Sequence, residues 1–133
     1  ELQVINAQTG ALIHYSKENN LVVALGKKNI AKLIAGEGSA VTKISVGEGT
    51  APAAAGDAIL TNPYTKTVDA VTYPTDNSVR FSFTLGSGDA NGMNISELGL
   101  ITAGNQLFSR KTRSPIAKTS SVIITGLWTI TIN

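Results

Sequence analysis

The stretch Val79-Arg-Phe-Ser-Phe-Thr-Leu85 alternates strictly between apolar and polar side chains. Such alternation puts the two kinds of side chain on opposite faces of an extended backbone, and it is typical of a half-buried β-strand. The C-terminal stretch from Val122 to Ile132 has the same character. One parity there carries aliphatic and aromatic residues, and the other carries the threonines Thr125, Thr129 and Thr131. Two long one-sided strands predict a β-rich domain with antiparallel sheets.

Shorter segments of the same kind surround these two strands. A weak hairpin is expected from Leu2–Ile5 and Ala11–Tyr15, because Gly10 allows a positive φ in the turn between them. A second hairpin is expected from Ile95–Ile101 and Leu107–Lys111. The remaining strand-like segments are Val41–Val46 and the Thr- and Val-rich Tyr64–Tyr73.

Three irregular segments separate the expected strands. Glycine and proline predict a loop at Gly47–Asp57, and a second loop is expected at Gly86–Asn94. The segment Thr112–Lys118 is interpreted as a connection, since Pro115 lacks the N–H that a sheet needs.

One segment has helical rather than strand periodicity. Apolar residues recur three and four apart between Asn20 and Gly36, which predicts an amphipathic helix over 20–35. Asn19 or Asn20 can cap its first turn, Gly26 weakens its middle, and Gly36 can end it in a left-handed conformation.

Together these elements predict an α+β, β-rich fold, an antiparallel β-sandwich-like domain with one N-terminal amphipathic helix. A chain of 133 residues and 13.8 kDa has the size of one domain. We expect a single domain over 1–133, with a weak N-terminal hairpin or arm at 1–18, the helix at 20–35 and a β-rich body at 41–133.

The composition excludes several classes of protein. A hydrophobic fraction of 42% argues against intrinsic disorder, and no apolar run approaches the roughly 20 residues of a membrane span. The net charge of +2 does not by itself indicate nucleic-acid binding. The absence of cysteine removes thiol nucleophiles and Cys-based zinc sites. We expect no cofactor, no metal, no nucleic-acid partner and no membrane insertion.

The candidates for catalysis are few, and each has a plainer interpretation. His14 has no nucleophile-elbow serine to act upon and is interpreted as an ordinary structural or surface residue. Glu97 is the one acidic residue inside a well-defined strand, and Asp69 and Asp76 complete the set from which a hydrolase could be built. A hydrogen-bonded or outward strand carboxylate is favoured for Glu97, so we expect no enzyme.

Ligand-binding patterns are equally incomplete. Three Gly-X-Gly pairs, at 36–38, 47–49 and 86–88, lack the remaining residues of a phosphate-binding loop and are interpreted as turns. Asp89, Asn91 and Asn94 offer oxygens suited to Ca²⁺, but Leu100 stands where an EF-hand loop would close with glutamate.

Four basic residues lie close together in the sequence, and they are candidate contacts for an anion or an acidic partner: Arg110, Lys111, Arg113 and Lys118. A solvated surface cluster is the plainer interpretation. Three aromatic residues could form a sugar-stacking platform, but they share the parity of aliphatic neighbours and are assigned to the core: Phe81, Phe83 and Trp128.

An ordered series of motifs spans about residues 20–133. The expected helix precedes Val41-Thr-Lys-Ile-Ser-Val-Gly-Glu-Gly-Thr-Ala-Pro52, and Asn94-Ile-Ser-Glu-Leu-Gly-Leu-Ile101 leads through a turn into Gln106-Leu-Phe-Ser-Arg110. The segment Pro115-Ile-Ala-Lys-Thr-Ser-Ser121 then leads into the last strand. This order resembles the bacteriophage tail-fibre and tail-collar family, with Ser45 where that family often has Ala.

The resemblance implies a virion-proximal fibre domain that works as a viral structural protein rather than an enzyme. It implies a homo-oligomer, with a homotrimer favoured, partnered by other tail or baseplate proteins. The place would be the phage tail of the virion, after synthesis in the bacterial host cytoplasm. The helix face with Val22, Ile30 and Ile34, or part of the last strand, is a candidate subunit interface.

Two other functions stay open at this point. A capsid decoration protein would be equally small and β-rich. A host-glycan-binding module would use the loops Gly47–Asp57 and Gly86–Asn94, because loops on rigid β scaffolds commonly carry binding residues.

Overall fold

The computed structural model describes residues 1–133 and contains ten β-strands and one α-helix. The strands form two antiparallel five-stranded sheets, in the orders β2-β1-β10-β7-β6 and β3-β9-β8-β4-β5. The chain divides into two compact units with one sheet each. The first unit comprises Glu1–Glu18, Thr67–Gly92 and Lys118–Asn133, and the second comprises Asn19–Lys66 and Met93–Ala117. The prediction of a β-rich fold with one helix is confirmed.

The first unit is built around the two one-sided strands of the sequence, β7 (Ser78–Leu85) and β10 (Val122–Thr131). They pair antiparallel, with Trp128 opposite Phe81 and Gly126 opposite Phe83. A side chain at Gly126 would collide with the Phe83 ring, so the glycine makes room for the aromatic ring across the strand pair. Phe81, Phe83 and Trp128 are all buried. Their assignment to the core is confirmed.

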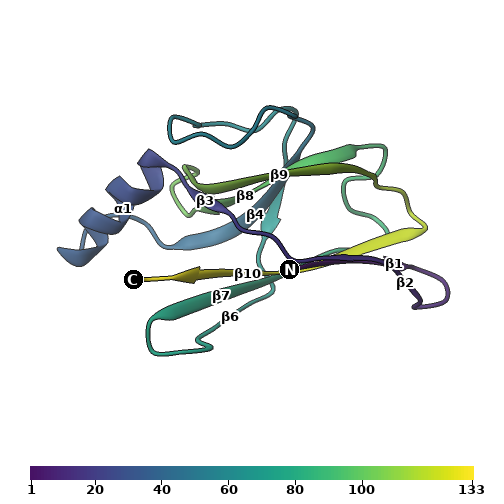
Figure 1. Ribbon diagram of the computed structural model, residues 1–133, viewed down its shortest axis with the longest axis horizontal. Helices are drawn as coiled ribbons and strands as arrows, with labels where there is room; N and C mark the ends of the chain where they lie inside the picture. The colour runs from purple at the N-terminus through teal and green to yellow at the C-terminus, as the bar shows by residue number, and fades with distance from the viewer. The chain divides into compact units, whose positions relative to one another are not determined.

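Three shorter strands complete this sheet. β1 (Leu2–Asn6) and β2 (Leu12–Ser16) form the expected N-terminal hairpin (Figure 1). Gly10 has φ +74° in the turn between them. β1 also pairs with β10, which places the N-terminal segment inside the sheet. β6 (Ala70–Thr72) forms the opposite edge against β7.

The second unit holds the expected hairpin of β8 (Asn94–Thr102) and β9 (Leu107–Ala117), with β4 (Val41–Gly47) beside β8. The strands β3 (Leu21–Val22) and β5 (Tyr64–Thr67) form its edges.

Two sequence expectations about strand bounds were wrong. The segment 64–73 does not act as one strand, because β5 and β6 belong to different sheets. The segment Thr112–Lys118 is not a connection, because β9 continues through Pro115 to Ala117. The β8–β9 register shifts between Ile95 and Glu97, so Pro115 falls where the pairing is already irregular and its missing N–H costs no ladder bond.

The helix α1 (Ala24–Ile34) is shorter than predicted and begins without a side-chain cap. Leu21 and Val22 pair with β9 instead of opening the helix, so neither Asn19 nor Asn20 reaches its first turn. Val23 precedes the helix and is fully buried in a cluster with Leu60 and Leu107.

The predicted end of the helix is confirmed. Gly36 has φ +78°. Its N–H donates to the Leu33 carbonyl, and the N–H of Glu37 donates to the Lys32 carbonyl. This pair of bonds satisfies two carbonyls that the last turn would leave unpaired.

The buried face of the helix is not the aliphatic stripe that the sequence suggests. Gly26 and Asn29 are its buried residues, and a side chain at Gly26 would collide with the Phe108 carbonyl of β9. The Asn29 side chain exchanges two hydrogen bonds with the Ser39 backbone, at 2.8 and 2.9 Å. Ile34 is 85% exposed. The aliphatic stripe therefore does not mark the packed face of the helix, because close backbone approach decides which face packs. No helix of the structure is both long and apolar enough to cross a membrane.

Candidate functional site

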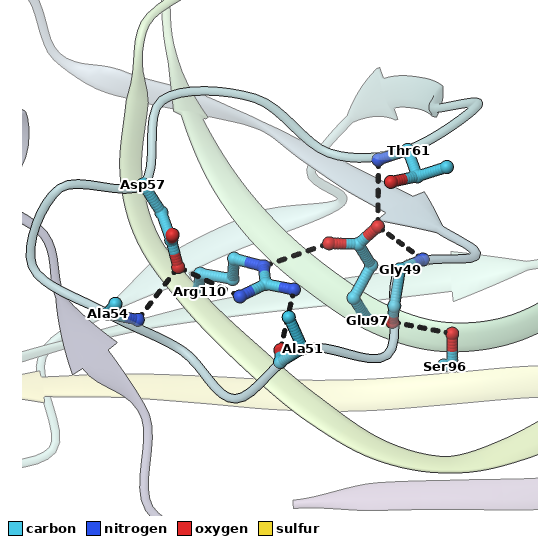
Figure 2. A network of polar contacts seen from close by, with 8 residues as sticks. All are labelled: Gly49, Ala51, Ala54, Asp57, Thr61, Ser96, Glu97 and Arg110. Carbon is cyan, nitrogen blue, oxygen red and sulfur yellow. Dashed lines mark hydrogen bonds and ion pairs between the residues drawn. The ribbon is translucent and has the colours of Figure 1, made fainter.

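The most elaborate polar arrangement in the second unit centres on Glu97 of β8, whose side chain is 1% exposed. Its Oε2 accepts hydrogen bonds from the N–H of Gly49 at 2.6 Å and the N–H of Thr61 at 2.8 Å. Its Oε1 accepts a hydrogen bond from Nε of Arg110 at 2.9 Å. Figure 2 shows this carboxylate between the guanidinium and the two backbone N–H groups. The expectation of a hydrogen-bonded strand carboxylate is confirmed.

The glycines of the Gly47-Glu48-Gly49 segment make room for that carboxylate. A Cβ at Gly47 would lie 2.7 Å from Oε2 of Glu97, and a Cβ at Gly49 would come closer still. The hydroxyl of Ser96 donates to the Gly49 carbonyl at 2.7 Å and holds the same peptide from its other side. This Gly-X-Gly segment therefore receives an anion, but the anion is the protein's own side chain.

Arg110 of β9 connects Glu97 to the loop formed by residues 48–61. Its Nη1 donates to Oδ2 of Asp57 at 2.8 Å, and its Nη2 donates to the Ala51 carbonyl at 3.0 Å. The three charged side chains, Glu97, Arg110 and Asp57, are called the ion triad below. Glu97 and Arg110 are almost completely buried, whereas the Asp57 side chain is 25% exposed.

The electrostatics of Arg110 and Asp57 favour their charged forms. Burial alone would lower the pKa of Arg110, but the hydrogen bonds and charges of Glu97 and Asp57 outweigh it and raise that pKa above the usual value. The pKa of Asp57 is lowered, first by the hydrogen bond from the Ala54 N–H and then by Arg110. The pKa shifts of Arg110 and Asp57 consequently both favour the ion pair that ties the loop to the sheet.

The candidate partner contacts Arg110, Lys111, Arg113 and Lys118 do not form one exposed cluster. Arg110 belongs to the ion triad, and Lys118 is 1% exposed, so the interpretation as a solvated cluster was wrong for these two. Lys111 and Arg113 are half-buried in β9. Lys118 moreover belongs to the first compact unit, whereas the other three belong to the second.

Lys118 holds the other glycine-rich loop. Its Nζ donates to Oδ1 of Asn91 at 3.0 Å and to the Thr119 carbonyl at 2.8 Å. The N–H of Gly92 donates to the Lys118 carbonyl. Burial lowers the pKa of Lys118, and the charge of Asp89 partly opposes that shift.

Internal contacts occupy oxygens of two of the three residues considered for Ca²⁺. Oδ2 of Asp89 accepts the Gly86 N–H at 2.8 Å, and Oδ1 of Asn91 faces the Lys118 ammonium. No group of three His, Cys, Asp or Glu residues is placed to hold a metal ion. His14 is exposed on β2, opposite Val4. Asp69 and Asp76 belong to the first unit and Glu97 to the second.

Comparison with family models, with curated proteins and with solved structures found no match to this chain.

The ion triad was not foreseen from the sequence, although a signal for part of it existed. Arg110 lies opposite Gly99 in the β8–β9 hairpin, which makes it the diagonal neighbour of Glu97. Opposite charges at such positions attract, so the predicted hairpin already suggested this pair. Asp57 lay in a loop without periodicity, and nothing in its local sequence indicated the contact.

Proposed function

We propose that this chain is a non-enzymatic structural protein of a bacteriophage virion, either part of the tail fibre or an adaptor at the baseplate periphery. One observation carries the proposal most strongly. Two separate motifs of the tail-fibre resemblance meet in space, because Glu97 of the Ile-Ser-Glu-Leu-Gly-Leu strand accepts the N–H of Gly49 from the Val-Gly-Glu-Gly segment. Residues of the two motifs thus form one structural contact.

The chemistry of that contact also supports a non-enzymatic role. Both oxygens of Glu97 are occupied by internal N–H donors, and Arg110 uses three nitrogens on neighbouring protein oxygens. A general acid or base needs a free position next to its substrate. The proposal includes the sandwich-like arrangement and the homotrimer that the resemblance implies.

Immunogold labelling of purified particles tests the place of the protein. Label at the tail fibre or baseplate supports the proposal, and label confined to the head supports the decoration protein instead. Light scattering of the purified chain over a concentration series tests the oligomer. A stable species near three times 13.8 kDa is expected for a fibre component.

A host-glycan-binding module is the second candidate, and one observation favours it. Both loops considered for that role are fixed by buried charged side chains, the 48–61 loop by Arg110 and the Gly86–Gly92 segment by Lys118. Preorganised loops lose less entropy on binding. Binding of the purified chain to host polysaccharide on a glycan array would favour this candidate. Absence of binding across the array would exclude it.

A further inference from the structure

The 48–61 loop is fixed along its whole length. Glu97 binds the N–H groups of Gly49 and Thr61 near the two ends, and Arg110 binds Asp57 and the Ala51 carbonyl in the middle (Figure 2). Leu60 is buried in the cluster with Val23 and Leu107. The loop therefore has a defined shape before it meets any partner.

The outward side of this loop is mostly apolar. Besides Thr50, Gly56 and Thr61, its exposed residues are small or aliphatic: Ala51, Pro52, Ala54, Ala55, Ala58 and Ile59. Ile59 is 85% exposed, so its side chain buries little apolar surface in the isolated chain. A large aliphatic side chain on a rigid loop has the properties of an anchor, because it can fill a partner's pocket at little entropic cost.

Positive charge lies next to this apolar surface. The N–H of Ala24, the first residue of α1, donates to the Ala55 carbonyl at 2.8 Å, so the helix starts at the loop. Lys27 and Lys28 follow within one turn, and both are exposed. The second unit as a whole has eight basic and four acidic residues, a net charge of +4. A twofold contact between two copies of this face would oppose like charges, whereas an acidic partner would be attracted.

We propose that the 48–61 loop is a docking surface for another protein of the particle, one that offers an apolar socket bordered by carboxylates. Ile59 enters the socket, and Lys27 and Lys28 face the carboxylates. The ion triad keeps the loop in the shape that the socket accepts. This inference rests on the proposed function, because it names the surface by which the chain attaches.

The test uses particles produced without this chain, to which the purified chain is added back at increasing concentration. Ile59→Ser is expected to weaken binding by about 10- to 100-fold, the equivalent of losing one buried aliphatic side chain. Ile13→Ser is the control, since Ile13 is also an exposed isoleucine, 55% exposed, and lies on β2 in the other unit. It should bind like the wild type.

The charged rim is tested by Lys27→Glu combined with Lys28→Glu, which should weaken binding most at low salt. Equal binding by wild type and Ile59→Ser would overturn the inference, as would an equal loss in Ile13→Ser. Sedimentation that shows Ile59→Ser to disrupt self-association, with particle binding unchanged, would assign the surface to a second copy and also overturn it. Failure of the wild type to bind particles would reject the proposed function itself, and the inference with it.

Discussion

Replacing Arg110 by methionine should destabilise the second unit severely. Methionine retains much of the aliphatic length of arginine but leaves the Glu97 carboxylate, 1% exposed, without its cation. Breaking a buried ion pair from one side costs about 3–5 kcal/mol in the free energy of unfolding. Arg110→Met also removes the hydrogen bonds to Asp57 and the Ala51 carbonyl, so we expect the upper half of that range.

Urea denaturation followed by two probes measures this loss. Far-UV circular dichroism reports on the strands of both units, whereas fluorescence reports on the single tryptophan, Trp128, which belongs to the first unit. A shift of both transitions to lower urea means that the units unfold together. A shift seen by circular dichroism alone means that the second unit unfolds by itself.

Two further variants make the reasoning refutable. Arg113→Met is the same change on the same strand at a half-buried site, and it should cost no more than about 1 kcal/mol. Combining Arg110→Met with Glu97→Gln should cost less than the sum of the single changes, by roughly 0.5–3 kcal/mol, because the two residues interact directly. Additive costs, or a loss below about 1 kcal/mol for Arg110→Met, would refute the ion triad as described.

Three other predictions concern different parts of the chain. Gly126→Ala should destabilise the first unit by about 1–3 kcal/mol in urea denaturation, because its Cβ would overlap the Phe83 ring. Lys118→Met should speed amide hydrogen exchange in the Gly86–Gly92 segment, with little change at β8, since Asn91 and Thr119 lose their donor. Because the pKa of Asp57 is lowered from 3.8, its contribution to stability is present at neutral pH and is lost as the pH falls through that lowered value. Asp57→Asn should therefore flatten the acid end of a plot of stability against pH, and an unchanged slope would contradict the contacts of Asp57 with the Ala54 N–H and Arg110.

The strands could be predicted from the sequence wherever one face is buried and the other is not. β7 and β10 satisfy that condition, and their alternation located them with the correct faces. The irregular part of β9 could not be found in this way, because Pro115 indicates a loop unless the register shift in its partner strand is known. The short strand β3 was hidden for a related reason, since Leu21 and Val22 also fit the helical period.

The helix shows where periodicity misleads. Its aliphatic residues suggested the buried face, yet Gly26 and Asn29 are buried and Ile34 is exposed. The Gly26 contact with the Phe108 carbonyl depends on close backbone approach, which hydrophobic patterns do not encode. The candidate site was missed similarly, because Glu97, Arg110 and Asp57 come from three separate segments. Only tertiary structure shows that they meet.

The energetics of the buried charges indicate what they contribute. A buried ion pair commonly adds little net stability, because its attraction mainly offsets the cost of removing both ions from water. Besides their bonds to Glu97 and Thr119, however, Arg110 and Lys118 each donate hydrogen bonds to oxygens of a glycine-rich loop. Apolar residues of similar size could fill the same volume, but they could not hold the Ala51 carbonyl or the Asn91 amide in one position. The charges therefore act chiefly on loop shape. That is the property a docking surface requires, and it makes the 48–61 loop, with Ile59 exposed upon it, a stronger candidate for attachment than either sheet.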